Sequence, residues 1–516
     1  MKKYMIFFML LLCCIAQGQN KMGYTWVVGM NASYAKFDGT NAAPQTGQLY
    51  NISHPNSPFA FTNGSSNICD SLSGDIVFSC NGMIMYNATG GIIENGDHLV
   101  PNNIYYHNAI PNSSYTQSSI ILPKGTNGEY YVIIPTVSDS LYNIYWTNPN
   151  GTKAPFDLLR YNVVDMKLNG GDGKVIEKDK ILLQNIEISK VMMQACKHSN
   201  GRDWWLLKHG STQNIIYRFL VTKDSIYGPF MQTFAQPIWD YWDLFGQSAF
   251  SKDGKKYAAV MGKKSKLFMA DFDRCSGELS NPKVYNIPID STTVPYWDNQ
   301  QSFDSISRGL CFSNNGNYVY LSKTFNIYQF EYGQSDSSLA WYRVKHGFDT
   351  SQVAFEYYDQ LYRAPNNRIY IGKYGGSLTQ FSTIDNPDNK GVACGFCRKC
   401  FRIDTAQGGL TSPPNMPDYD LGADMGSICW PLANVDIQKE NEVAIYPNPA
   451  SSFLIIESES LNQQANELSV FNLLGEEVIS KKFKTTNSRY QIDVSHFKKG
   501  IYLLKVNEYV RKLVIE

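Results

Sequence analysis

The sequence predicts an all-β protein, in which a β-propeller with seven expected blades is followed by a small C-terminal β-sandwich. Three observations predict this class. The 516 residues include 34 Tyr, 27 Phe and 9 Trp, and such aromatics favour strands. Short strand-like runs alternate with Gly, Asn and Asp turns from about residue 23 to 432. Long stretches with the periodicity of an amphipathic helix are hard to find.

The first 18 residues predict a signal peptide. Lys2 and Lys3 precede an apolar run at 4–15, which is too short to span a bilayer. Residues 16–18 then supply the small residues of a cleavage site. No later run is long and apolar enough to cross a membrane, so we expect an exported, soluble protein that starts near Gln19 and has no transmembrane segment.

The strand-like runs are about five residues long, which is the usual length of a strand. They lie at 75–80, 118–122, 130–134, 204–208, 256–260, 266–271, 318–321, 326–330 and 368–372.

A repeat recurs among these runs. The pattern Phe-Ser-x-(Asn/Asp)-Gly occupies 78–82, 250–254 and 312–316, with a degenerate copy at 363–367 and Asn-Gly pairs at 127–128 and 200–201. We interpret each copy as a hairpin with the Asn-Gly or Asp-Gly pair at its tip and Phe at the start of an inner strand. Spacings of about 45 to 75 residues fit four-stranded propeller blades. A strand near residues 24–29 is expected to close a further blade by pairing with late strands.

Several longer motifs carry a family resemblance. They are Trp26-Val-Val-Gly29, Ile68-Cys-Asp70, Gln117-Ser-Ser-Ile-Ile-Leu-Pro123 and Pro414-Asn-Met-Pro-Asp-Tyr419. The region resembles a family of exported, WD40-like seven-bladed propellers. This resemblance implies a fold and a location, but no catalytic activity.

The C-terminal segment has a separate pattern after a polar stretch at 433–441, which suits a linker. Its motif residues are Tyr446, Pro447, Asn448, Pro449, Gly475, Gly500, Tyr502 and Lys512. The order of strands and turns resembles the type A C-terminal sorting domain of type IX secretion. The resemblance implies the type IX secretion machinery as a partner and a secreted or cell-surface location. The expected domains are a signal peptide at 1–18, a propeller at 19–432, a linker at 433–441 and a sorting domain at 442–516.

The charge balance excludes one class of partner. Lys and Arg number 46, as do Asp and Glu, so the formal net charge is zero. A nucleic-acid binder needs a basic field to displace counterions from phosphates, so we expect no nucleic-acid partner.

Three cysteines lie close together as Cys394-x2-Cys397-x2-Cys400. This spacing opens a ferredoxin pattern, but the fourth ligand position holds Asp404 and the next residue is not Pro. A zinc site would need Cys429 as its fourth ligand. Because export favours disulfides, we expect a bridge from Cys429 to one of these three, most cysteines oxidised, and neither metal nor cofactor.

Catalytic motifs are missing from the sequence. The seven histidines form no H-E-x-x-H pattern, and neither a G-x-S-x-G elbow nor a P-loop is present. Ser251-Lys-Asp253-Gly254 matches only half of a sialidase-type box. The carboxylates Asp240, Asp243, Glu356 and Asp359 lie near aromatics that could stack on sugars. They keep open an extracellular polysaccharide- or peptide-active hydrolase with a propeller active site.

We therefore expect a non-catalytic surface or secreted binding scaffold, with no catalytic residues, that meets an extracellular glycan or protein. A structural component of a surface machine is a third alternative. The expected ligand contacts are Trp239, Asp240, Tyr241, Trp242, Asp243 and Trp297. Tyr and Trp suit such contacts because they give large, rigid contact area at low entropic cost.

Overall fold

The structure is a computed structural model of the chain. The described residues form two compact units that divide after residue 430. The predicted signal peptide and linker lie outside the described residues. The structure describes residues 20–40, 42–51, 53–56, 59–107, 113, 115–146, 155–211, 214–235, 246–262, 265–289, 306–345, 357–374, 379–403, 412–429, 444–457, 461, 465–472, 476–485, 488–507 and 509–516.

The first unit is built from small antiparallel sheets, as the composition predicts. Two sheets have three strands: β1 (Thr25–Val28), β2 (Ser33–Lys36) and β3 (Gln45–Gln48), then β4 (Ser66–Cys69), β5 (Ile76–Cys80) and β6 (Met85–Asn87). Three sheets have four strands: β14 (Gly246–Phe250), β15 (Lys256–Met261), β16 (Lys266–Phe272) and β17 (Leu279–Asn286); β18 (Ser307–Phe312), β19 (Tyr318–Lys323), β20 (Ile327–Glu331) and β21 (Trp341–Lys345); β22 (Tyr357–Arg363), β23 (Ile369–Tyr374), β24 (Gln380–Ile384) and β25 (Phe396–Arg402).

A larger sheet of seven strands comes, in sequence order, after the three-stranded sheets and before the four-stranded ones. Its strands follow in sequence order: β7 (Ile120–Pro123), β8 (Glu129–Thr136), β9 (Phe156–Asp165), β10 (Lys174–Lys197), β11 (Trp204–Gly210), β12 (Ile215–Val221) and β13 (Ile226–Thr233).

The 24-residue strand β10 joins two antiparallel groups in this sheet. Its first part pairs with β9 and its last part with β11, and Ile188 lies opposite a residue of each neighbour. The register shifts several times, and Asp179, Asn185 and Met192 have positive φ. These irregularities let one strand serve both β7–β10 and β10–β13.

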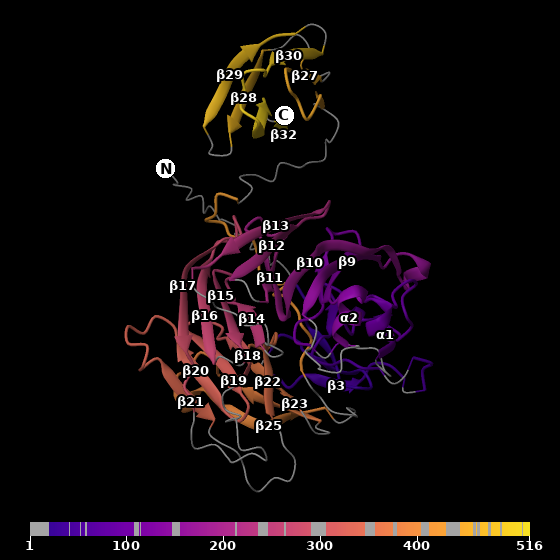
Figure 1. Cartoon of the computed structure of the whole chain (residues 1–516), viewed down its shortest axis with the longest axis vertical. Helices are drawn as coiled ribbons and strands as arrows, with labels where there is room; N and C mark the ends of the chain where they lie inside the picture. The colour runs from indigo at the N-terminus through magenta and orange to yellow at the C-terminus, as the bar shows by residue number, and fades with distance from the viewer. Residues whose placement is uncertain are drawn as a thin grey trace, which may run out of the picture. The chain divides into compact units, whose positions relative to one another are not determined.

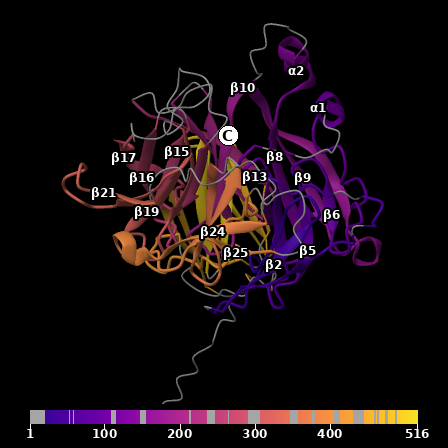
Figure 2. The same ribbon diagram turned by 90° about the horizontal axis from the view of Figure 1, so that it is seen from below.

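The first strands of successive sheets lie next to one another. β14 contacts the end of β10, β18 contacts β14, and β22 contacts β18. Figure 1 shows β14, β18 and β22 toward the middle of the first unit, with β17, β21 and β25 farther out. Figure 2, seen from below, shows β15, β16 and β17 of one such sheet side by side. Each four-stranded sheet therefore runs outward from an inner strand.

The repeated motif forms hairpin turns, although not everywhere between the same strands. In the turn after β14, the Gly254 N–H donates to Ser251 O at 2.9 Å and the Ser251 N–H to Lys256 O at 3.0 Å. Gly254 has φ of 70°, and a Cβ there would lie 2.7 Å from the Cys196 Sγ. Both the turn and the close packing therefore require glycine.

The position expected for the motif phenylalanine is wrong. Phe250 and Phe312 end β14 and β18, because the turn begins at the following serine. Phe78 lies inside β5, which is the second strand of its sheet.

The expected pairing of the N-terminal strand with late strands is also wrong. β1 pairs with β2 through a short turn that includes Ala32 with positive φ, so the local hairpin provides its partner. The contact with the late sheet is through side chains. Trp26 packs edge-on against Tyr370, with ring centroids 5.4 Å apart.

The first unit also contains short helices that the sequence pattern did not indicate. They are α1 (Asn102–His107) and α2 (Asp139–Trp146), with 3-10 turns at Asn169–Gly171 and Gly391–Cys394. In the part of the chain that the structure describes, none of the helices is both long and apolar enough to cross a membrane.

The C-terminal unit consists of two sheets around its own core. One has β26 (Ala444–Tyr446), β27 (Phe453–Glu457) and β30 (Arg489–Asp493); the other has β28 (Asn466–Asn472), β29 (Glu477–Phe483), β31 (Gly500–Val506) and β32 (Tyr509–Ile515). Alternate residues of the strands, such as Leu454, Val470 and Leu504, fill the core. Burial in these strands follows the period of two that an extended backbone imposes.

Several predicted motif residues hold this unit together. Asn448 donates through its side-chain amide to Lys512 O at 2.7 Å and accepts from the Val514 N–H at 2.8 Å. Tyr446 donates to the Glu457 carboxylate, and the Tyr502 hydroxyl donates to Lys498 O at 2.8 Å. Pro447 and Pro449 flank Asn448, and Gly500 begins β31. Gly475 lies outside the described residues.

The expected cysteine pairing is wrong. Cys429 is bonded to Cys275, and Cys397 is bonded to Cys400 within β25. Cys394 is a free thiol, as are Cys69, Cys80, Cys196 and Cys311, and all five are buried. The expectation that most cysteines are oxidised is therefore also wrong, since five of the nine described cysteines are free thiols. The described residues contain no group of three His, Cys, Asp or Glu side chains that could hold a metal.

Two neighbouring residues of β11 are buried bases. The Lys208 ammonium donates to Val191 O at 2.7 Å, and burial holds the pKa of Lys208 well below its usual value. Burial, with the neighbouring Lys208, lowers the pKa of His209 well below its usual value. The His209 Nε2 lies 2.5 Å from the Tyr257 hydroxyl. Burial therefore shifts both side chains toward their neutral forms in the folded protein.

We expect Lys208 to contribute to the unfolding free energy a term that rises with pH, opposite in sign to the contribution of the buried thiols, whose pKa values are raised. Below its unfolded pKa of about 10.4, the unfolded chain binds a proton that the folded chain does not, so stability falls as pH falls. The slope is about 1.4 kcal/mol per pH unit for one proton. Lys208→Met should remove this slope in urea unfolding between about pH 8 and pH 10. The exposed Lys255→Met serves as the control, and equal slopes in both variants would contradict the assignment.

Candidate functional site

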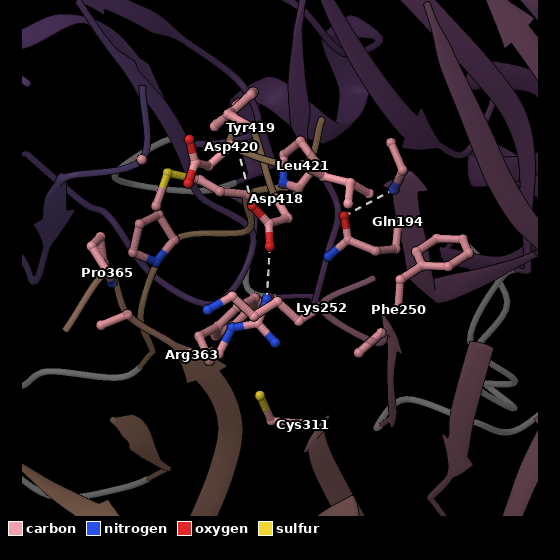
Figure 3. A pocket seen from close by; sticks show the side chains of 18 of the residues that line it. Gln194, Phe250, Lys252, Cys311, Arg363, Pro365, Asp418, Tyr419, Asp420 and Leu421 are labelled. Carbon is pink, nitrogen blue, oxygen red and sulfur yellow. Dashed lines mark hydrogen bonds and ion pairs between the residues drawn. The ribbon is translucent and has the colours of Figure 1, made fainter. Parts of the chain in front are cut away.

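A cavity of about 230 Å³ lies where the inner strands of the first unit end. Its walls come from β1, the end of β10, β14, β18 and β22, together with residues 412–429, here named the closing segment. Figure 3 shows the side chains that converge on this cavity. Strands far apart in the sequence therefore contribute to a single site.

A buried polar network anchors the closing segment next to the cavity. Asn415 donates through its side-chain amide to Ser119 O at 2.9 Å and to Met193 O at 3.3 Å. Its side-chain oxygen accepts from the amides of Gln194 and Gln117, at 3.2 and 3.3 Å. The backbone carbonyls of two inner strands are thereby satisfied by one asparagine, which fixes the closing segment in place.

Cations of the first unit hold the rest of the closing segment. Lys197 donates to Tyr419 O at 2.9 Å, and Arg274 donates to Gly422 O. Lys255 forms an ion pair with Asp424 at 3.2 Å. The bond between Cys429 and Cys275 fixes the end of the segment.

Two cations and two carboxylates line the cavity itself. Arg363, the last residue of β22, donates from Nη2 to the Asp418 Oδ2 at 2.7 Å. Lys252, in the turn after β14, donates to the Asn367 side-chain oxygen at 3.1 Å. The Asp420 Oδ1 accepts from the Asn20 N–H at 2.9 Å. The formal charge of the lining is therefore balanced.

The nucleophiles that line the cavity are not activated. Burial raises the pKa of Cys196 to about 12 and that of Cys311 to about 11, so both thiols stay protonated at neutral pH. The Ser251 hydroxyl donates to Asp253 and accepts from the Lys256 N–H at 2.9 Å, which is a turn contact. Neither side chain has the arrangement of a catalytic nucleophile and its base.

Asp359 is a buried carboxylate on β22, next to the inner polar network. It accepts a hydrogen bond of 2.9 Å from the Asn63 amide, and burial raises its pKa despite the opposing attraction of Arg308. The carboxylates expected to accompany it in a hydrolase, Asp240, Asp243 and Glu356, lie outside the described residues. The expected ligand contacts Trp239, Tyr241, Trp242 and Trp297 also lie outside them.

The sequence analysis missed Arg363 and Lys252, although the repeat carried a signal for both. Arg363 occupies the place that Phe250 and Phe312 hold in the other copies, at the end of an inner strand. Lys252 is the variable residue of its copy. A charge in place of a core aromatic marks a strand end that faces a cavity.

Comparison with known protein families gives a match for the C-terminal unit. Residues 444–516 match the family described as the secretion system C-terminal sorting domain. This C-terminal segment is a sorting domain. It implies export through the type IX secretion machinery, and with it secretion or display at the cell surface. No curated protein matches the chain significantly.

Solved structures show only distant likeness. A putative 6-phosphogluconolactonase from Bacteroides uniformis is 13% identical with a TM-score of 0.35, covering 83% of this chain and 98% of that one. The periplasmic gluconolactonase of Pseudomonas aeruginosa is 10% identical with a TM-score of 0.34, covering 88% and 98%. Kluyveromyces lactis Hsv2 is 9% identical with a TM-score of 0.35, covering 70% and 89%. Likeness at this level supports no conclusion about this chain.

Proposed function

We propose that the first unit is a seven-bladed, WD40-like β-propeller that acts as a non-catalytic binding scaffold outside the cell. The seven blades would be β1–β3, β4–β6, β7–β10, β10–β13, β14–β17, β18–β21 and β22–β25. The contacts of β4 with β1 and β7, of β10 with β14, of β14 with β18 and of β18 with β22 support such a ring. Trp26 of β1 and Tyr362 of β22 share a hydrophobic cluster, which supports its closure.

The hydrogen bonds and protonation of the groups that line the cavity support binding without catalysis. Its carboxylates accept hydrogen bonds from Arg363 and from backbone N–H groups, and its thiols are protonated. Hydrolysis needs a nucleophile or water activated by a poised base. A concave site with apolar walls and a few polar groups suits recognition of a ligand. The domain bounds proposed are a signal peptide at 1–18, the propeller at 19–432, a linker at 433–441 and the sorting domain at 442–516.

The second candidate function is a polysaccharide- or peptide-active hydrolase. One observation favours it, namely the raised pKa of the buried Asp359, since such a carboxyl can serve as a general acid. Its partner carboxylate would come from Asp240, Asp243 or Glu356.

We expect the mature protein to release no product from a panel of polysaccharides and peptides. The matched variants are Asp240→Ala, Asp243→Ala, Glu356→Ala and Asp359→Asn, assayed beside the unaltered protein by reducing-end and amine release. Partners are captured in parallel by binding to immobilised glycans. Turnover that disappears in any one variant would replace the scaffold with the hydrolase.

A further inference from the structure

Arg363 has more hydrogen-bonding capacity than its described neighbours use. Its side chain is only 14% exposed, and a guanidinium carries five N–H donors. Among the residues that the structure describes, it donates one side-chain hydrogen bond, to Asp418. A mostly buried cation is costly unless its donors find acceptors. The cavity that it lines must therefore supply them, from water or from a ligand.

Lys252 adds a second cation to the same lining. Its ammonium has three donors, and the contact with Asn367 uses one of them. The two carboxylates of the lining are already engaged: Asp418 accepts from Arg363 and from the Asp420 N–H, and Asp420 accepts from the Asn20 N–H. Figure 3 shows Asp418 and Arg363 joined across the cavity. Free donors on cations beside satisfied carboxylates favour an oxyanion as ligand.

The number of charges limits which oxyanion fits. Arg363 and Lys252 are balanced formally by Asp418 and Asp420, so a dianion such as phosphate would meet repulsion from two carboxylates. A carboxylate brings a single charge and two oxygens that match the fork of a guanidinium.

Part of the remaining wall is apolar and partly accessible. Phe250, Pro365, Met416 and Leu421 line the cavity and are half-buried. Such side chains gain free energy when a ligand covers them. The body attached to the carboxylate should therefore be apolar and small enough for a cavity of about 230 Å³.

We propose that this cavity binds a small organic monocarboxylate. Its carboxylate accepts hydrogen bonds from Arg363 and Lys252, and its apolar body lies against Phe250, Pro365, Met416 and Leu421. This inference rests on the proposed binding function and gives it a ligand class.

The test is calorimetry of the mature full-length protein with N-acetyl-L-leucine and with N-acetyl-L-leucinamide, which has nearly the same shape without the charge. We expect the acid to bind at least about tenfold more tightly than the amide, because charge-assisted hydrogen bonds are lost. Arg363→Gln and Lys252→Gln should each lower the affinity for the acid by about tenfold. Lys283→Gln, at an exposed lysine of β17 that does not line the cavity, should leave the affinity unchanged. Asp418→Asn should strengthen binding, because it frees Arg363 of its competing carboxylate.

Equal affinities for acid and amide, tighter binding of inorganic phosphate than of the acid, or unchanged binding in Lys252→Gln would each overturn the inference. Lys252 is exposed, so Lys252→Gln should fold normally. It therefore still tests the inference if Arg363→Gln unfolds at a lower temperature than the unaltered protein. The scaffold proposal fails separately: product release in the panel assay would reject it whatever this cavity binds. Conversely, glycan capture that is unaffected by Lys252→Gln, with no acid binding, would reject the carboxylate site alone.

Discussion

A protein that lacks residues 442–516 should fold its first unit but remain in the periplasm. The reason is that the sorting domain carries the export signal, while the first unit has its own sheets and hydrophobic clusters. Fractionation of cells that express the full-length and truncated chains measures this. The truncated chain should be protease-resistant and confined to the periplasm, with essentially no extracellular product.

Two point variants on β31 test whether export requires a folded sorting domain, without shortening the chain. Leu504 is 1% exposed in the core of that unit, and the adjacent Lys505 is exposed. Leu504→Asp buries an unpaired carboxylate and should cost about 4 kcal/mol or more, which abolishes export. Lys505→Glu should leave export near normal. Normal export of either the truncated chain or Leu504→Asp would contradict a role for the folded sorting domain.

The features that the sequence predicted are local ones. An Asn-Gly or Asp-Gly pair sets its own backbone, so the turns at Gly201, Gly254 and Gly316 could be placed without knowing the rest of the fold. The sorting domain was likewise recognised from the order of strands and turns within its own segment, which includes β31.

The features that it missed depend on contacts between distant parts of the chain. Strand β10 is divided between two groups by irregularities that only its neighbours select. The partner of Cys429 lies 154 residues earlier, at a distance where spacing carries no information. Arg363 could not be predicted as a site residue, because only the folded chain brings it together with Asp418 and Lys252 beside the same cavity.

Removal of the bond between Cys275 and Cys429 should destabilise the first unit strongly. The bond closes a loop of 154 residues, and in the chain-entropy account of disulfides such a loop contributes about 5 kcal/mol. The matched control is the bond between Cys397 and Cys400, whose sequence separation is 3, so that its removal should cost only about 2 kcal/mol. Urea unfolding of the Cys275→Ala, Cys429→Ala and Cys397→Ala, Cys400→Ala double variants measures both effects.

Removal of the bond between Cys275 and Cys429 should also weaken ligand binding at the cavity. The closing segment ends at Cys429 and supplies Met416, Asp418 and Asp420 to the cavity wall, so release of its end loosens one wall. The cations Lys197 and Arg274 still hold the middle of the segment, and the inner strands keep their ladders. We therefore expect earlier proteolysis after residue 420 and weaker binding of N-acetyl-L-leucine in the Cys275→Ala, Cys429→Ala variant, but not in the control. Equal stability losses in the two double variants would show that the long loop is held by contacts other than its disulfide.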